Sequence, residues 1–188
     1  KRFSANVALE ASEENPFLEK FYRDSRTFAF QTQLFFLLNR YRQQTDLSQS
    51  NLFNEMTITD YIFEKDRIFA YLNLDENELE LYEQVYQLLK ARIHKPDLVL
   101  LLQASSEVLM RRITKRQRSI EKSISPRYVD EVNLAYNDFF FKYDDTPLLV
   151  VNTNDIDFVA HEEDLNDLIA KINTMKQGRE YFVPLGSA

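Results

Sequence analysis

Short apolar runs alternate with longer amphipathic stretches along this chain. Residues 97–103 and 147–152 are apolar without polar alternation, which is the pattern of strands covered on both faces of a parallel sheet. Shorter runs at 6–9 and 56–60 predict two further strands. The order of elements therefore predicts an α/β fold, a parallel sheet flanked by helices on both sides.

Between these strands, apolar residues recur at helical spacing. Asn15 stands where a helix cap would be, with Pro16 in the first turn, and Ser105 and Ser125 are placed to cap two later helices. The predicted helices cover residues from 16 onward, 25–49, 61–72, 75–93, 105–117, 125–144 and 164–175. Because no repeat, heptad array or low-complexity linker interrupts them, we expect a single domain over residues 1–188.

Composition excludes several classes of function. The chain has 30 acidic and 23 basic residues and a net charge of −7 at pH 7, which disfavours nucleic-acid binding because that needs clustered cations. It has no cysteine, which excludes disulfides and zinc–thiolate sites and suits a reducing compartment. Its two histidines, His94 and His161, are far apart and read as surface residues, so a Ser–His–Asp triad is not expected.

Glycine is the most unusual feature of the composition. The chain has two glycines, Gly178 and Gly186, both near its C-terminal end, so no glycine-rich phosphate loop can be built from these residues. Either phosphate is not bound in that way, or a glycine-bearing piece lies upstream of Lys1. No apolar stretch approaches the ~20 residues that a membrane-spanning helix needs, and no signal peptide is visible.

Polar side chains at strand ends are the first candidates for a site, because ligands of open parallel sheets bind at the carboxyl ends of the strands. Those side chains are Glu10, Asp60, Gln103 and Asn152. Glu10 could take a proton from a substrate hydroxyl that attacks phosphorus. An exposed loop glutamate is the more common role for such a residue, so both readings stay open.

Two further patterns carry chemistry. Residues 109–118 hold five cations and no acid, which suits a polyphosphate but also complements a helix C-terminus. In the aromatic-rich helix at 25–49, Gln33 and Arg40 are seven apart, so they share a largely apolar face where polar groups are unexpected. In the run 139–141, we expect two phenylalanines in the core and the third in a dimer contact.

The order of motifs matches a known family. The motifs are Glu10 with Glu14-Asn15-Pro16-Phe17-Leu18 and Phe21-Tyr22-Arg23-Asp24, then Ala29-Phe30-Gln31-Thr32-Gln33 with Arg40, then Arg112 with Arg116-Gln117-Arg118 and Glu121. Over essentially the whole chain, this order resembles the deoxynucleoside kinases, including the bacterial deoxyadenosine/deoxyguanosine kinases. The resemblance implies a P-loop-kinase-like fold with an arginine-rich lid at about 112–125. It also implies a first strand and a P-loop upstream of Lys1, with ATP and Mg²⁺ as cofactors.

The resemblance assigns a role to individual residues on the nucleoside side. It makes Glu10 the general base that takes the proton of the deoxyribose 5′-hydroxyl. Tyr22 and Glu121 are similar to the pair that holds the 3′-hydroxyl. Gln33 and Arg40 are similar to the residues that bind the base.

On the nucleotide side, Arg112, Arg116 and Arg118 resemble the lid arginines that close over the phosphates. Asp157 and Phe158 resemble the loop that borders the adenine of ATP.

The chain departs from the family at three places. Thr59-Asp60-Tyr61 replaces the usual Glu/Asp-Arg-Ser, where Asp60 could still serve as a carboxylate near magnesium. Lys65, with Asp66 beside it, stands where the family has an acidic base-site residue, although Phe69 matches the aromatic expected four residues later. Gln117 replaces the glycine between two lid arginines, which would stiffen the lid.

The expected function is ATP-dependent phosphorylation of the 5′-hydroxyl of a deoxynucleoside, with a purine favoured, by a cytoplasmic homodimer in nucleotide salvage. The alternative is a catalytically silent relative that binds a nucleoside or a partner protein. A nucleoside monophosphate kinase would share the arginine-rich lid, but Tyr22 and Glu121 fit a free sugar hydroxyl better than a phosphate.

Overall fold

The computed structural model describes residues 3–50 and 56–184, and the chain divides into two compact units. The first unit comprises residues 1–94 and 118–124, and the second comprises residues 95–117 and 125–188. Both units contain parallel β-structure with packed helices, as the hydrophobic pattern predicts.

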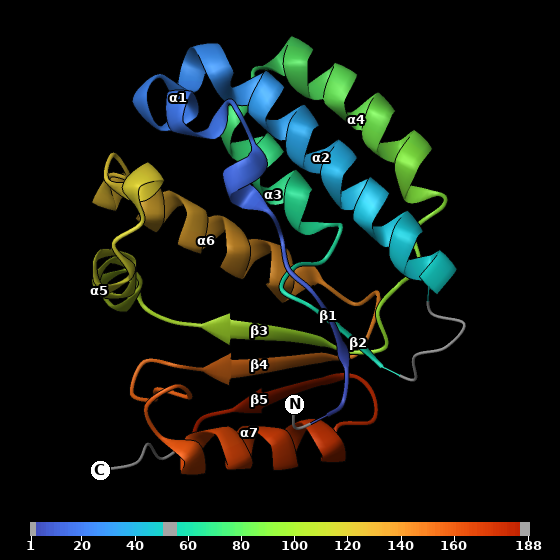
Figure 1. Ribbon diagram of the computed structural model, residues 1–188, viewed down its shortest axis with the longest axis vertical. Helices are drawn as coiled ribbons and strands as arrows, with labels where there is room; N and C mark the ends of the chain where they lie inside the picture. Colours follow the sequence, from blue (N-terminus) through green and yellow to red (C-terminus); the bar gives the residue numbers. More distant parts are fainter. Residues whose placement is uncertain (1–2, 51–55, 185–188) are drawn as a thin grey trace. The chain divides into compact units, whose positions relative to one another are not determined.

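In the first unit, strands β1 (Asn6–Ala8) and β2 (Thr57–Thr59) pair in parallel with Val7 opposite Ile58. The helical elements of this unit are η1 (Ser12–Glu14), α1 (Leu18–Arg23), α2 (Ser25–Ser50), α3 (Lys65–Asn73), α4 (Glu76–Lys90) and η2 (Ser119–Glu121). Helices α2 and α4 lie side by side and both contact α3 (Figure 1). A capping box between Asp75 and Glu78 fixes the start of α4.

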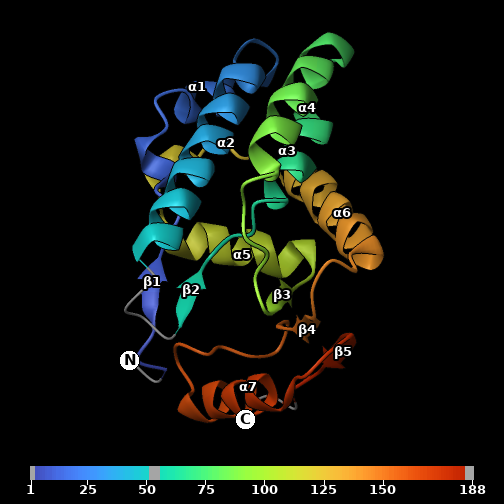
Figure 2. The same cartoon turned by 90° about the vertical axis from the view of Figure 1, so that its right-hand side faces the viewer.

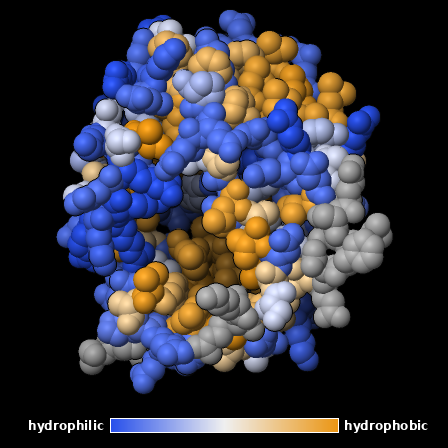
Figure 3. Space-filling view, viewed as in Figure 1, coloured by the Kyte–Doolittle hydropathy of each residue, from blue (hydrophilic) through white to orange (hydrophobic). Residues whose placement is uncertain are grey.

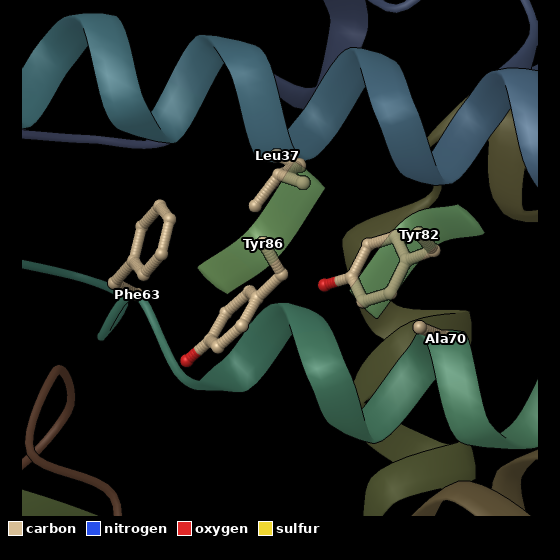
Figure 4. Close-up of a cluster of buried hydrophobic side chains, with 5 residues drawn as sticks. All are labelled: Leu37, Phe63, Ala70, Tyr82 and Tyr86. Atoms are coloured by element: carbon tan, nitrogen blue, oxygen red, sulfur yellow. The ribbon is translucent and has the colours of Figure 1, made fainter. Parts of the chain in front are cut away.

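The core of the first unit lies between these three helices. Leu37 of α2, Ala70 of α3, and Tyr82 and Tyr86 of α4 are all fully buried, with Phe63 beside them (Figure 4). The ring of Phe63 stacks on that of Tyr86 at 5.2 Å between centroids. This aromatic core anchors α3, whose first turn carries part of the candidate site.

In the second unit, strands β3 (Val99–Gln103), β4 (Leu148–Asn152) and β5 (Arg179–Phe182) form a parallel sheet in the order β3-β4-β5. Its helices are α5 (Ser106–Arg116), α6 (Pro126–Lys142) and α7 (Glu162–Thr174). Helix α7 lies on one side of the sheet and α6 on the other (Figure 2). The continuous apolar strand β4 is buried over Leu148–Val151, as expected of a strand covered on both faces.

Serine caps were predicted correctly. Ser105 accepts a hydrogen bond from the backbone N–H of Val108, and Ser125 accepts one from Tyr128, so both side chains satisfy otherwise orphaned donors at helix starts.

His94 and His161 are exposed, as predicted. Of the three phenylalanines at 139–141, Phe140 is buried and Phe141 is 73% exposed.

Several predicted boundaries are wrong, among them the end of α4, which lies at Lys90 rather than Ile93. Helix α3 begins at Lys65 rather than Tyr61, because the Thr59 hydroxyl donates to the carbonyl of Tyr61 and a turn follows before the helix. Helix α1 begins at Leu18, since Asn15 ends η1 and its side chain accepts from the N–H of Phe17. Helix α7 begins at Glu162 rather than at residue 164.

Strand β5 was not predicted at all. It follows Gly178, which has a φ of +73°, and its two charged residues precede two aromatic ones without the alternation typical of a strand. Two sets of contacts define this strand. It pairs in parallel with β4, and the guanidinium of Arg179 donates to the carbonyls of Phe140, Phe141 and Tyr143 at the end of α6.

Candidate active site

Two carboxylates follow the paired strands of the first unit. Because β1 and β2 run in parallel and in register, their carboxyl ends bring Glu10 and Asp60 together. The backbone N–H of Glu10 donates to Oδ1 of Asp60 at 2.7 Å. Glu10 and Asp60 therefore stand at one edge of this two-stranded sheet, as expected. The other two strand-end candidates, Gln103 and Asn152, end strands of the three-stranded sheet instead.

The side chain of Glu10 is held by two cations. Arg40 donates from Nε to Oε1 of Glu10 at 2.5 Å, and Nζ of Lys65 lies 3.2 Å from Oε2. Burial raises the pKa of Glu10, but the charges and hydrogen bonds of Arg40 and Lys65 outweigh it, and the pKa falls below its ordinary 4.5. Glu10 is therefore a carboxylate at neutral pH, the form that a general base requires.

Arg40 also binds a second carboxylate, that of Asp66. Its Nη1 donates to Oδ1 of Asp66, and the hydroxyl of Tyr82 donates to Oδ2 at 2.7 Å. The side chain of Asp66 is completely buried. Burial raises its pKa to about 6, although Arg40 and the Tyr82 hydroxyl both favour the charged form.

Gln33 and Arg40 lie on one face of α2, as their spacing predicts, and both are buried. Gln33 donates from Nε2 to the backbone carbonyl of Asp66 at 3.0 Å, which leaves its Oε1 to accept from a ligand. Phe69 is half-buried on α3, one turn after Lys65.

Tyr22 and Glu121 come from elements that pack against each other, namely α1 and η2. The ring of Tyr22 lies 5.5 Å from that of Phe21, which is buried. The guanidinium of Arg118 lies within 4.0 Å of both Glu13 and Glu121. The first unit thus gathers a mixed-charge group around the loop that follows β1.

In the second unit, α5 carries Arg112 and Arg116. The guanidinium of Arg112 donates to the hydroxyl of Thr153 at 2.9 Å, to its carbonyl, and to the carbonyl of Ile156 at 3.1 Å. Arg116 is exposed in the last turn of the helix. Arg112 therefore ties α5 to the loop after β4.

That loop contains Asp157 and Phe158. The carboxylate of Asp157 accepts from the N–H groups of Val159 and Ala160, and these two bonds hold its pKa below its ordinary value. Nζ of Lys115 lies 3.7 Å from the same carboxylate. Phe158 packs against the buried residues of β4 and α7.

Comparison with known proteins shows to which family this chain belongs. The family model described as deoxynucleoside kinase matches residues 1–177. The chain belongs to the deoxynucleoside kinase family. It is 31% identical over 180 residues to deoxyguanosine kinase of Bacillus subtilis (strain 168), covering 93% of this chain and 87% of that protein. It is 26% identical to the deoxyadenosine/deoxycytidine kinase of the same organism, over 92% of this chain and 82% of that one.

Solved structures agree. Deoxyadenosine kinase from M. mycoides, with the products dCMP and a flexible dCDP bound, superposes with a TM-score of 0.78 and 26% identity, covering 93% of this chain and 88% of that chain. The same enzyme with bound dATP gives a TM-score of 0.77. The parallel sheets and flanking helices of this deoxynucleoside kinase are thus those of a P-loop-kinase-like fold.

The structure adds Tyr82 to the residues that the sequence singled out in this deoxynucleoside kinase, and it shows the part played by Asp66. Lys65 was noted as a cation at the place of a family acid, and here it lies against Glu10 while the neighbouring Asp66 is the buried acid. The signal for Asp66 was its position on α3, one turn before the buried Ala70, where an apolar residue is expected. Tyr82 gave no signal of its own, because a tyrosine on an apolar helix face is typical of a core.

No helix in the described part of this kinase is both long enough and apolar enough to cross a membrane.

Proposed function

We propose that this deoxynucleoside kinase transfers the γ-phosphoryl group of ATP to the 5′-hydroxyl of a purine deoxynucleoside, with Glu10 as the general base. The observation that carries the proposal is the state of Glu10, which stands at the end of β1 and is kept ionised by Arg40 and Lys65. The names of the relatives, deoxyguanosine kinase and deoxyadenosine kinase, support a purine.

In this mechanism a carboxylate oxygen of Glu10 accepts the proton of the 5′-hydroxyl while the 5′-oxygen of the nucleoside forms its bond to the γ-phosphorus. The bond between the γ-phosphorus and the bridging oxygen breaks, and ADP leaves with that electron pair. Arg112, Arg116 and Arg118 are proposed to face the phosphates, where guanidinium groups would offset the charge that spreads over the transferred oxygens. That Arg112 and Arg116 reach Glu10 and its neighbours stays a prediction.

Other residues would hold the nucleoside. Tyr22 and Glu121 are proposed to bind the 3′-hydroxyl, a role supported by the packing of α1 against η2. Gln33 and Arg40 are proposed to hydrogen-bond the base while Phe69 packs against it. Lys65 acts beside them by holding Glu10.

Asp157 and Phe158 are proposed to border the adenine of ATP.

Asp60 is the proposed magnesium ligand. One of its oxygens accepts the Glu10 N–H, which leaves the other oxygen to face a cation. In the described residues no group of three or more acidic, histidine or cysteine side chains could hold a metal ion. A lone carboxylate still fits, since Mg²⁺ in phosphoryl transfer is held by one or two carboxylates together with substrate phosphates. The ion would neutralise phosphate charge there.

We also propose that residues 1–188 act as one domain in a cytoplasmic homodimer. Hydrophobic residues gather on the surface over α4, which carries the exposed Leu81 and Leu88 (Figure 3). On α6, Phe141 is 73% exposed. Sedimentation of wild-type protein and Phe141→Ser tests the dimer, and a wild-type monomer at micromolar concentration would contradict it.

The proposed reaction is tested with the full-length enzyme, ATP and Mg²⁺. Deoxyguanosine, deoxyadenosine, deoxycytidine and thymidine are each supplied, and both ADP and the 5′-monophosphate are measured. We expect equal amounts of the two products, with at least one purine deoxynucleoside preferred. Nucleoside binding by calorimetry without product formation would instead indicate a catalytically silent relative.

A further inference from the structure

Helix α4 places two tyrosines in the core of the first unit, one turn apart. Tyr82 and Tyr86 are both fully buried, and their rings lie between α2 and α3, 6.1 Å apart (Figure 4). Their hydroxyls differ in environment. The hydroxyl of Tyr82 donates to Asp66, whereas that of Tyr86 is buried with no hydrogen-bond partner among the described residues.

This contrast separates the packing role of a ring from the role of its hydroxyl. At Tyr86 the core tolerates a hydroxyl that makes no hydrogen bond, so the ring accounts for that residue's contribution to packing. At Tyr82 the hydroxyl binds a charged group, and a hydrogen bond to a charged partner is stronger than one between neutral groups.

The carboxylate that Tyr82 binds is connected to Glu10. Asp66 accepts from Arg40, and the same guanidinium donates to Glu10. Lys65 lies against the other oxygen of Glu10, and Asp60 accepts a hydrogen bond from the backbone N–H of Glu10. Of the four side chains that these ion pairs join, Asp66 is the only one that is completely buried.

We propose that Tyr82 is a positioning residue for phosphoryl transfer: its hydroxyl orients Asp66, Asp66 orients Arg40, and Arg40 holds the carboxylate of Glu10 in place. The inference rests on the proposed role of Glu10 as the base. Tyr82 acts through Asp66 and Arg40 and need not contact the substrate.

The consequence of losing the hydroxyl follows from the charges around Asp66. It is faced by Arg40 from α2, by Tyr82 from α4, by Glu10 from the loop after β1, and by its neighbour Lys65. Without the Tyr82 donor the charged form of Asp66 is less favoured, so its pKa rises above about 6. A protonated Asp66 no longer offsets the charge of Arg40, so the guanidinium that holds Glu10 loses its buried counter-charge.

The test compares Tyr82→Phe with the matched control Tyr86→Phe in the full-length enzyme. For each, kcat and the KM for the nucleoside are measured from pH 5 to 9, together with thermal melting. For Tyr82→Phe we expect the acid limb of kcat to move up by about half a pH unit or more. At pH 6.5, kcat should be lower by about 1.5-fold for a half-unit shift and by about threefold for a full unit, and it should approach the wild-type value at pH 9. Tyr86→Phe should keep the wild-type profile.

A purely structural role would lower the melting temperature of Tyr82→Phe while leaving the shape of its pH profile unchanged, and that result would overturn the proposal. Should Tyr82→Phe not fold, site-specific 3-fluorotyrosine at position 82 keeps the ring and supplies a stronger donor. The acid limb should then move to lower pH, and an unmoved limb would reject the proposal. Absence of kinase activity in the wild-type enzyme would refute the proposed function itself. If the wild type and Tyr82→Phe are both active and their pH profiles match, only the role of Tyr82 is refuted.

Discussion

Arg40 and Asp66 form an ion pair that is almost sealed from solvent, with side chains 3% and 0% exposed. A buried ion pair loses hydration on both sides, so it adds little stability compared with apolar residues of similar size. The raised pKa of Asp66 reflects that cost directly. The pair is better understood as part of the arrangement around Glu10 than as a source of stability.

The first prediction is a pH dependence of stability that Asp66 causes. In the folded protein its pKa is about 6, against an ordinary 3.8, so the folded state binds more protons than the unfolded state between these values. Stability from this group is therefore lost as pH rises from about 4 to about 6. Relative to Asp66→Asn, the wild-type free energy of unfolding should fall by about 2–3 kcal/mol across this window.

Urea unfolding of both proteins at half-unit steps from pH 4 to 7.5 measures this difference. Glu10 is present in both, so its own titration contributes to each curve. Parallel curves for the two proteins would show that Asp66 does not titrate in this range.

The second prediction concerns the base. Glu10→Gln keeps the shape of the side chain and can still accept from Arg40, but it cannot take up a proton. We expect kcat to fall by about 10²-fold or more, while the dissociation constant of the nucleoside changes by only about threefold. Initial rates measure kcat, and calorimetry measures the dissociation constant of the nucleoside. Glu14→Gln, an exposed acid in η1, is the matched control, and an equal loss in both variants would remove Glu10 from the chemistry.

The sequence predicted those parts of the fold that local pattern determines. Strands β3 and β4 are continuous apolar runs, and the serine caps of α5 and α6 lie directly before their helices. Strand β5 has no such pattern: Arg179 and Glu180 are charged, and its identity depends on pairing with β4. A strand that long-range pairing defines cannot be found from its own residues.

The same distinction holds for the site. The positions of Glu10 and Gln33 could be predicted because one follows a strand and the other is a polar residue on an apolar helix face. Tyr82 was missed because its hydrogen bond to Asp66 joins residues 16 apart on different helices, and nothing in the local pattern of α4 indicates it. The hydrogen bonds of Arg112 to the loop after β4 were missed for the same reason, because they join residues that are distant in the sequence.

The third prediction concerns Arg112. Arg112→Ala removes three hydrogen bonds to Thr153 and Ile156, the residues that shape the loop carrying Asp157. We expect the KM for ATP to rise about tenfold or more and the unfolding free energy to fall by about 1–3 kcal/mol, with a smaller change in the KM for the nucleoside. Kinetics with each substrate varied in turn measure this split. Arg111→Ala removes an exposed neighbouring cation and serves as the control; if it raises the KM for ATP equally, general charge rather than these hydrogen bonds is responsible.

The fourth prediction concerns the backbone at Gln117. This residue ends the first segment of the second unit, and the next residue, Arg118, belongs to the first unit. Gln117 has φ 53° and ψ 31°, the left-handed conformation, which costs a residue with a Cβ atom about 1 kcal/mol and costs glycine almost nothing. Gln117→Gly relieves this strain but also loosens the unfolded chain, so the net gain should be about 0.5 kcal/mol or less. Gln117→Ala keeps the strain and is the reference. Chemical denaturation should therefore rank Gln117→Gly at or above Gln117→Ala, whereas at an ordinary helical position the glycine variant would be less stable by about 1 kcal/mol. That ordinary ranking would show that the left-handed conformation is not maintained.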